Sequence, residues 1–175
     1  MAAGRSIQET VNINTLGPRR VCDAFIPLLD QEVGRVVNIA SASGPNYVRG
    51  LSPEKQELFT SRSTTWEQLE AEIRRCAAGT DYEGIAYGLS KACLNVYTMQ
   101  LAATHPNLRI NSCSPGYVLT DLTAGMGASN TPEQSNCHVA PLFLLFDEPE
   151  DNGRYYGSDG VRSPLDRYRG PGDPP

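Results

Sequence analysis

Two short apolar runs, separated by a long helical pattern, most constrain the fold of this 175-residue chain. Residues 35–41 (RVVNIAS) and 108–113 (LRINSC) are rich in β-branched or alternating apolar residues and are predicted strands. Residues 89–102 between them carry the helical pattern, and residues 154–158 predict a last strand. This succession indicates a parallel sheet with helices on its faces, so the predicted fold class is α/β.

Before the first strand, apolar residues recur at helical spacing over about residues 7–30. Pro18 has no N–H and cannot bond to the carbonyl of Asn14, which falls on the apolar stripe. Two alternatives stay open. One long helix would leave the Asn14 carbonyl in need of another partner such as water. Two shorter helices would instead break at Gly17 and Pro18.

The polar interval between the first strand and the long helix predicts a helical insertion over about residues 45–82. Ser52 and Pro53 form a helix start, and Thr65 has capping-box spacing ahead of an apolar stripe that begins at Trp66. We expect this stripe to serve packing more than substrate contact.

The remainder of the chain predicts a glycine-rich loop at residues 124–128 and a helix from Thr131 to Phe146, kinked at Pro141. From Ser163 on, residues 163–175 are rich in proline, glycine and arginine, which indicates an unstructured tail. One domain is therefore expected over residues 1–162.

Composition excludes several classes of function. A net charge of −5 argues against nucleic acid and anionic membrane surfaces as partners, and no apolar run approaches membrane-spanning length. Five cysteines without a C-x-x-C pair and only two histidines argue against a metal site and favour a reducing compartment. The start of the chain lacks the apolar core of a signal peptide, so a cytoplasmic location is expected.

Tyr87 and Lys91 stand four residues apart at the start of the long helix, which places both on one face. A nearby cation favours phenolate over phenol, so such a tyrosine can exchange a proton near neutral pH. The spacing alone also fits an ordinary solvent-exposed helix face. Lys55 is the only other lysine, so arginine is the usual cation of this chain and a lysine here carries more weight.

Ser41 ends the first strand, at the edge where open α/β sheets bind ligands, although serine also commonly ends strands. Together the motifs resemble the short-chain dehydrogenases/reductases. They are Asn14 within residues 11–17 (VNINTLG), Ser41 closing residues 34–41, Tyr87 with Lys91, and residues 114–121 (SPGYVLTD). They follow the family's order and spacing over roughly residues 8–160.

The resemblance implies a role for each matching residue. Tyr87 would exchange the proton with the carbonyl oxygen, Lys91 would favour its phenolate and bind the nicotinamide ribose, and Ser41 would polarise the substrate oxygen. The Asn14 main-chain carbonyl would hold a water that links Lys91 to solvent. The nicotinamide would be cradled by Pro115, Gly116, Val118 and Thr120.

The insertion before Tyr87 resembles the monomeric carbonyl reductase branch, which implies a monomer and NADP, with NAD as the other possibility. The implied reaction reduces a small aldehyde, ketone or quinone to an alcohol. The family's glycine-rich turn, T-G-x-x-x-G-x-G, its ribose-selecting residue and its N-N-A-G segment are absent. The chain therefore matches the C-terminal part of a Rossmann-like doubly wound sheet, with residues 35–41 as an exposed edge strand.

Two hypotheses follow from this departure. The chain is either part of a carbonyl reductase whose cofactor-binding half lies elsewhere, or a non-catalytic relative that acts as a binding or interaction protein. The presence of Asn14, Ser41, Tyr87 and Lys91 together favours the first.

Overall fold

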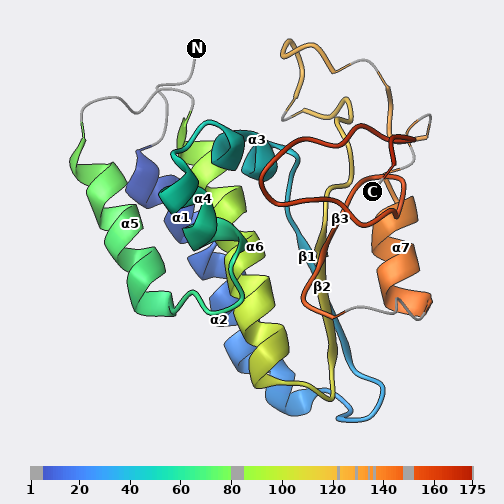
Figure 1. The fold of residues 1–175 in the computed structure, drawn as a ribbon. Coiled ribbons are helices and arrows are strands. Elements are labelled where there is room, and N and C mark those ends of the chain that lie inside the picture. Colours follow the sequence, from blue (N-terminus) through green and yellow to red (C-terminus); the bar gives the residue numbers. More distant parts are fainter. Residues whose placement is uncertain are drawn as a thin grey trace.

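Three parallel strands form the centre of the computed structural model, which describes residues 6–79, 85–121, 123–128, 130–133, 135, 137–147 and 152–174 (Figure 1). They are β1 (Arg35–Ile39), β2 (Arg109–Cys113) and β3 (Tyr155–Tyr156), in the order β1-β2-β3. Arg35 lies opposite Arg109 and Ile39 opposite Cys113, so all carboxyl ends meet at one edge. The predicted α/β class and parallel sheet are confirmed.

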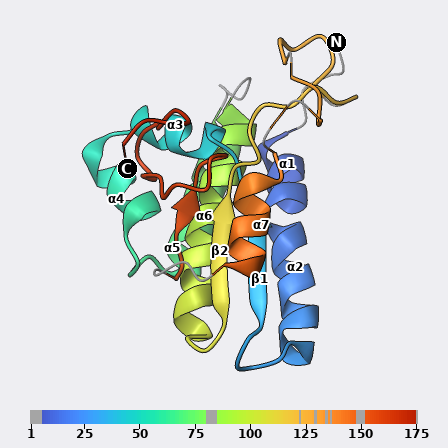
Figure 2. The same ribbon diagram turned by 90° about the vertical axis from the view of Figure 1, so that its right-hand side faces the viewer.

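Helices cover both faces of the sheet (Figures 1 and 2). One face carries α6 (Ile85–Thr104), backed by α1 (Ile7–Asn14), α2 (Leu16–Phe25) and the short 3-10 helix η1 (Ile26–Leu28). The other face carries α7 (Val139–Phe146). Because α6 is apolar on most sides, most of its residues are buried. It contributes side chains to two core clusters, one with α1 and α5 and the other with the strands of the sheet.

The interval between β1 and α6 forms three helices, α3 (Ser43–Arg49), α4 (Pro53–Thr60) and α5 (Trp66–Ala78). The predicted capping box of α5 is present, with the Thr65 hydroxyl accepting from the Gln68 amide at 3.3 Å. Leu69 and Ile73 of α5 are buried in one cluster with Leu89 of α6. The apolar stripe of this segment therefore packs onto the core.

The N-terminal helical pattern is broken, but at Thr15 rather than at the predicted Gly17 and Pro18. Thr15 is fully buried, and its hydroxyl donates to the Ser90 carbonyl of α6 at 2.8 Å. Pro18 is the third residue of α2, where a helix has no intrahelical partner for an N–H. A tertiary contact, which local sequence cannot show, thus sets the position of the break.

Helix α7 begins at Val139, later than the predicted start at Thr131, and residues 131–133 are not helical. Pro141 therefore lies in the first turn of α7, and the reason for predicting a kink there does not apply.

The chain after β3 folds back over the carboxyl ends of the strands, beside α3 (Figures 1 and 2). The Ser163 amide donates to the Tyr155 carbonyl at 2.9 Å, and the side chain of Arg169 is buried among polar partners. Residues 163–174 thus differ from the unstructured tail that their composition predicts. Hydrogen bonds of Arg169 and of the backbone, together with Leu165 packed against the core, hold them in place.

Candidate active site

Ser41 lies between the end of β1 and the start of α3, where the strand turns into the helix. Its hydroxyl accepts a hydrogen bond from the Ser43 amide at 3.2 Å, and its carbonyl accepts from the Gly44 amide at 3.0 Å. A short hydroxyl side chain suits this turn because it replaces a backbone partner at the helix start. The turn holds the Ser41 hydroxyl at the carboxyl edge of the sheet.

Tyr87 and Lys91 share one face of α6, as their spacing predicts. The Lys91 Nζ lies 5.7 Å from the centre of the Tyr87 ring and donates to the Ile39 carbonyl at the end of β1, at 2.8 Å. The Tyr87 side chain is 48% exposed. Lys91 therefore bridges from the helix to the strand end two residues before Ser41, a contact that spans 52 positions of sequence.

Asn14 joins this group through its side chain. Its amide donates to the Ser90 hydroxyl at 3.0 Å, and that hydroxyl in turn donates to the Tyr87 carbonyl at 2.8 Å. The C-terminal end of α1 is thus tied to the first turn of α6 that carries Tyr87. Sequence reasoning assigned a role only to the main-chain carbonyl of Asn14 and missed this contact of its side chain.

Burial lowers the pKa of the Lys91 ammonium below its ordinary value of 10.5. Between the lowered value and 10.5, the unfolded chain binds more protons than the folded one, so the free energy of unfolding should rise with pH in that window. We expect wild type to gain stability relative to Lys91→Met as the pH rises through it. Urea denaturation of both proteins from about pH 7 to about pH 10.5 measures the difference. A pH-independent difference would contradict it.

A cavity of about 550 Å³ opens at the carboxyl edge of the sheet. Ser41 lines it on one side, together with the turn after β2, and the chain after β3 lines it on the other. Of the residues predicted to cradle a nicotinamide, the cavity is lined by Pro115, Gly116 and Val118. The backbone φ of Gly116 is +91°, a conformation that favours glycine.

Four of the predicted residues do not line this cavity, namely Asn14, Tyr87, Lys91 and Thr120. Tyr87 lines a neighbouring groove of about 460 Å³, and Ser43 and Asn46 line both hollows. No hydrogen bond joins Ser41 to Tyr87 in the described part of the chain. The Thr120 amide donates to the Thr123 hydroxyl at 2.8 Å, so Thr120 belongs to a local turn beyond the cavity.

Sequence reasoning missed the cavity wall formed by residues 157–159 and 168–171. Its charged members are Asp159 and Arg169, and its aromatic member is Tyr168. The available signal was an aspartate and an arginine separated by ten residues within a segment whose composition indicates disorder. A spacing of ten residues does not predict an ion pair, so only the folded structure shows that these two side chains meet.

The described residues include neither a cluster of metal-ligating side chains nor a membrane-spanning helix. No group of three or more His, Cys, Asp or Glu side chains among them could hold a metal ion. None of the helices in the described ranges is both long and apolar enough to cross a bilayer.

The chain is similar in sequence to dehydrogenases and reductases, although no family model matches it. It is 32% identical over 168 residues to (+)-neomenthol dehydrogenase of Arabidopsis thaliana, covering 88% of this chain and 55% of that protein. It is 30% identical over 160 residues to human carbonyl reductase [NADPH] 1, covering 83% and 56%.

A solved structure agrees with these sequence matches. Salutaridine reductase from Papaver somniferum superposes with a TM-score of 0.70 at 26% identity, over 88% of this chain and 56% of that one. The chain thus spans about half the length of the curated relatives it matches. On these grounds it belongs to the short-chain dehydrogenase/reductase family, with carbonyl reductases and neomenthol dehydrogenases among its relatives.

Proposed function

We propose that this chain is the catalytic, substrate-side part of an NADP(H)-dependent reductase that converts the carbonyl of an aldehyde, ketone or quinone to an alcohol. The observation that carries the proposal is the position of Lys91. Its ammonium lies against the Tyr87 ring and donates to the strand end beside Ser41. One cation therefore connects the proposed proton donor with the element that carries the proposed carbonyl-binding hydroxyl.

Each side chain has a distinct task in this reaction. The half-exposed Tyr87 hydroxyl gives its proton to the carbonyl oxygen, or takes one from the alcohol in reverse. Lys91 stabilises the phenolate that remains. The Ser41 hydroxyl donates to the carbonyl oxygen as negative charge develops on it. The Asn14 carbonyl, which Pro18 cannot engage, would hold a water that returns a proton toward Lys91.

The chain fits one end of a nicotinamide dinucleotide and not the other. The turn at Pro115 and Gly116, Val118 beside it, and the Lys91 ammonium would hold the nicotinamide and its ribose. Thr120 would have to leave its contacts with Thr123 to reach the carboxamide. NADP(H), or alternatively NAD(H), supplies the hydride when bound. The sequence has no glycine-rich turn between a strand and a helix to hold the pyrophosphate.

The sheet itself supports the view that a further segment completes the enzyme. Among the described strands, β1 is paired on one side only, although parallel strands are normally buried on both. Ile39 at its carboxyl end is 46% exposed, and Val33, two residues before its start, is 69% exposed. A strand of the cofactor-binding half would pair with the free side of β1. The helices α3, α4 and α5 cover α6, which supports a monomer.

Titration with NADPH and NADH tests the proposal on two proteins: the 175-residue chain and the longest polypeptide that its genomic reading frame encodes. Fluorescence of Trp66 and of the nicotinamide reports binding, and oxidation of the cofactor with a quinone reports turnover. We expect the longer polypeptide to bind NADPH and reduce the quinone, and the 175-residue chain to do neither.

Two outcomes would change the proposal. Turnover by the 175-residue chain would show that it is a complete enzyme and that the proposed second half is unnecessary. A folded chain without any longer reading frame, binding or turnover would favour the non-catalytic relative, which the missing pyrophosphate turn already makes the second candidate.

A further inference from the structure

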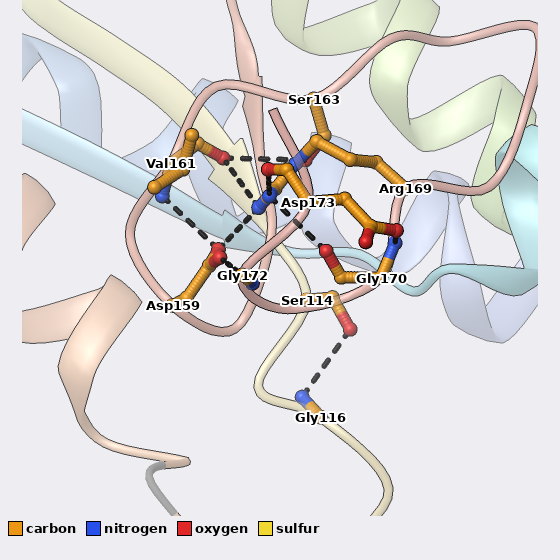
Figure 3. Close-up of polar contacts among 9 residues, drawn as sticks. All are labelled: Ser114, Gly116, Asp159, Val161, Ser163, Arg169, Gly170, Gly172 and Asp173. Carbon is orange, nitrogen blue, oxygen red and sulfur yellow. Dashed lines mark hydrogen bonds and ion pairs between the residues drawn. The ribbon is translucent and has the colours of Figure 1, made fainter. Parts of the chain in front are cut away.

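The loop after β3 is closed by an ion pair between Asp159 and Arg169, the clasp (Figure 3). The Arg169 Nη2 donates to Asp159 Oδ1, and its Nε donates to the Ser163 hydroxyl at 2.9 Å. The second carboxylate oxygen of Asp159 accepts from the Gly172 amide at 2.9 Å. Both charged groups are therefore occupied by partners inside the loop.

Gly157, directly after β3, leaves space for the two side chains of the clasp. A Cβ added at Gly157 would lie 2.7 Å from the Arg169 Nη2 and 2.8 Å from Asp159 Oδ1. Real Cβ atoms do not approach polar atoms so closely, so any other residue at position 157 would displace the ion pair. The bare backbone at this position lets the guanidinium lie against the strand.

The clasp holds the loop as a wall of the cavity beside Ser41. A Cβ added at Gly116 would lie 3.3 Å from the Ser158 Cβ, so the loop rests on the turn after β2. Tyr168, which is 50% exposed, and Pro171 line the cavity from the same loop. The wall therefore lines the same cavity as Ser41, Pro115, Gly116 and Val118.

The charge of this wall is balanced. Asp159 and Arg169 are the charged residues among the described residues that line the cavity. Burial opposes the ionisation of Asp159, but hydrogen bonds from the Gly172 amide and Arg169 outweigh it and hold the pKa of this carboxyl below 3.8. The Asp159 carboxylate is thus ionised at neutral pH, and its charge cancels that of the guanidinium. The other lining residues are neutral.

We propose that the clasp determines substrate specificity. It presents a wall without net charge, so the cavity takes neutral carbonyl compounds and discriminates against those that carry a carboxylate. The inference rests on the proposed reductase function, because it concerns the substrate of that site.

Two aromatic ketones that differ in charge and little in shape test this, namely 4-acetylbenzamide and 4-acetylbenzoate. Ligand-observed NMR titration of the whole chain gives the Kd of each. Asp159→Asn keeps the shape of the side chain and leaves the Arg169 cation unbalanced. We expect it to improve binding of the benzoate relative to the benzamide by about tenfold, the effect of one charge-assisted hydrogen bond. Arg169→Gln should shift the ratio the opposite way.

Two control variants define the site. Asp166→Asn makes the same change of charge outside this cavity, at a residue that pairs with Arg167. It should leave the ratio of the Kd of the benzoate to the Kd of the benzamide unchanged. Tyr168→Ala should weaken both probes several-fold if they lie against this wall. The proposal would be overturned if Asp159→Asn had the same Kd ratio as wild type, or if Asp166→Asn changed that ratio as much as Asp159→Asn does. It would also be overturned if wild type bound the benzoate more tightly than the benzamide, or did not bind the benzamide.

The two proposals can fail separately. Binding of these probes needs neither NADPH nor the Tyr87 proton. A shifted ratio in a protein that never reduces a carbonyl would leave the clasp as a charge filter and reject the reductase. Turnover lost in Tyr87→Phe, combined with an unchanged ratio in Asp159→Asn, would support the reductase and reject the clasp.

Discussion

Replacing Tyr87 by phenylalanine should lower carbonyl reduction by ~10²- to 10⁴-fold in the polypeptide that carries a complete cofactor site, the range expected for loss of a positioned proton donor. The change removes one hydroxyl and keeps the ring against Lys91. None of the described residues hydrogen-bonds this hydroxyl, and the side chain is half exposed, so the fold should be unaffected. Initial rates of NADPH oxidation with a quinone measure the effect.

The two lysines of the chain provide a matched comparison. Lys91→Met should also lose most activity, because the phenolate loses its cation. Lys55 lies in α4, pairs with the buried Glu72 of α5 at 3.2 Å, and lines neither the cavity of Ser41 nor the groove of Tyr87. Lys55→Met should therefore lower stability and leave turnover per folded molecule nearly unchanged.

If Tyr87→Phe retained more than about a tenth of the wild-type rate, Tyr87 would be excluded as the proton donor.

Replacing Gly88 by alanine should destabilise the protein by ~1–3 kcal/mol, the usual cost of overpacking a tight contact. A Cβ at this position would lie 2.8 Å from the Tyr47 Cβ and 2.9 Å from the Ser43 carbonyl oxygen. Both neighbours belong to α3, and one is backbone, so α3 itself would have to move away from α6. This outweighs the ~0.5–1 kcal/mol that alanine normally gains over glycine inside a helix.

The prediction therefore inverts the usual sign of a glycine-to-alanine change in a helix. Gly79→Ala serves as control, because a Cβ there would meet only the Cys76 carbonyl oxygen, at an ordinary 3.5 Å. Urea unfolding followed by the fluorescence of Trp66, the single tryptophan, measures both variants. Equal or greater stability of Gly88→Ala would show that α3 can withdraw without cost. The Ser43 turn beside Ser41 would then be less rigid than its contacts indicate.

Local chemistry was enough to predict the parts of the fold that depend on neighbours in sequence. The β-branched run before Ser41 forms β1, and the second run forms β2. The four-residue spacing of Tyr87 and Lys91 places them on one helix face because a helix turns once in 3.6 residues. The capping-box spacing at Thr65 likewise depends only on residues within one turn, and the box is present.

Contacts between distant segments decided the rest. The helix break at Thr15 depends on a carbonyl 75 positions away, and the reach of Lys91 to Ile39 spans 52 positions. The order of residues 163–174, whose composition indicates disorder, depends on the Asp159–Arg169 ion pair and on the packing of Leu165 against the core. By itself the sequence determined the strands β1 and β2, the capping box of α5 and the helix face that carries the tyrosine and lysine. Only the tertiary structure decided which charges cancel beside the cavity, because ion pairing depends on distance in space and not along the chain.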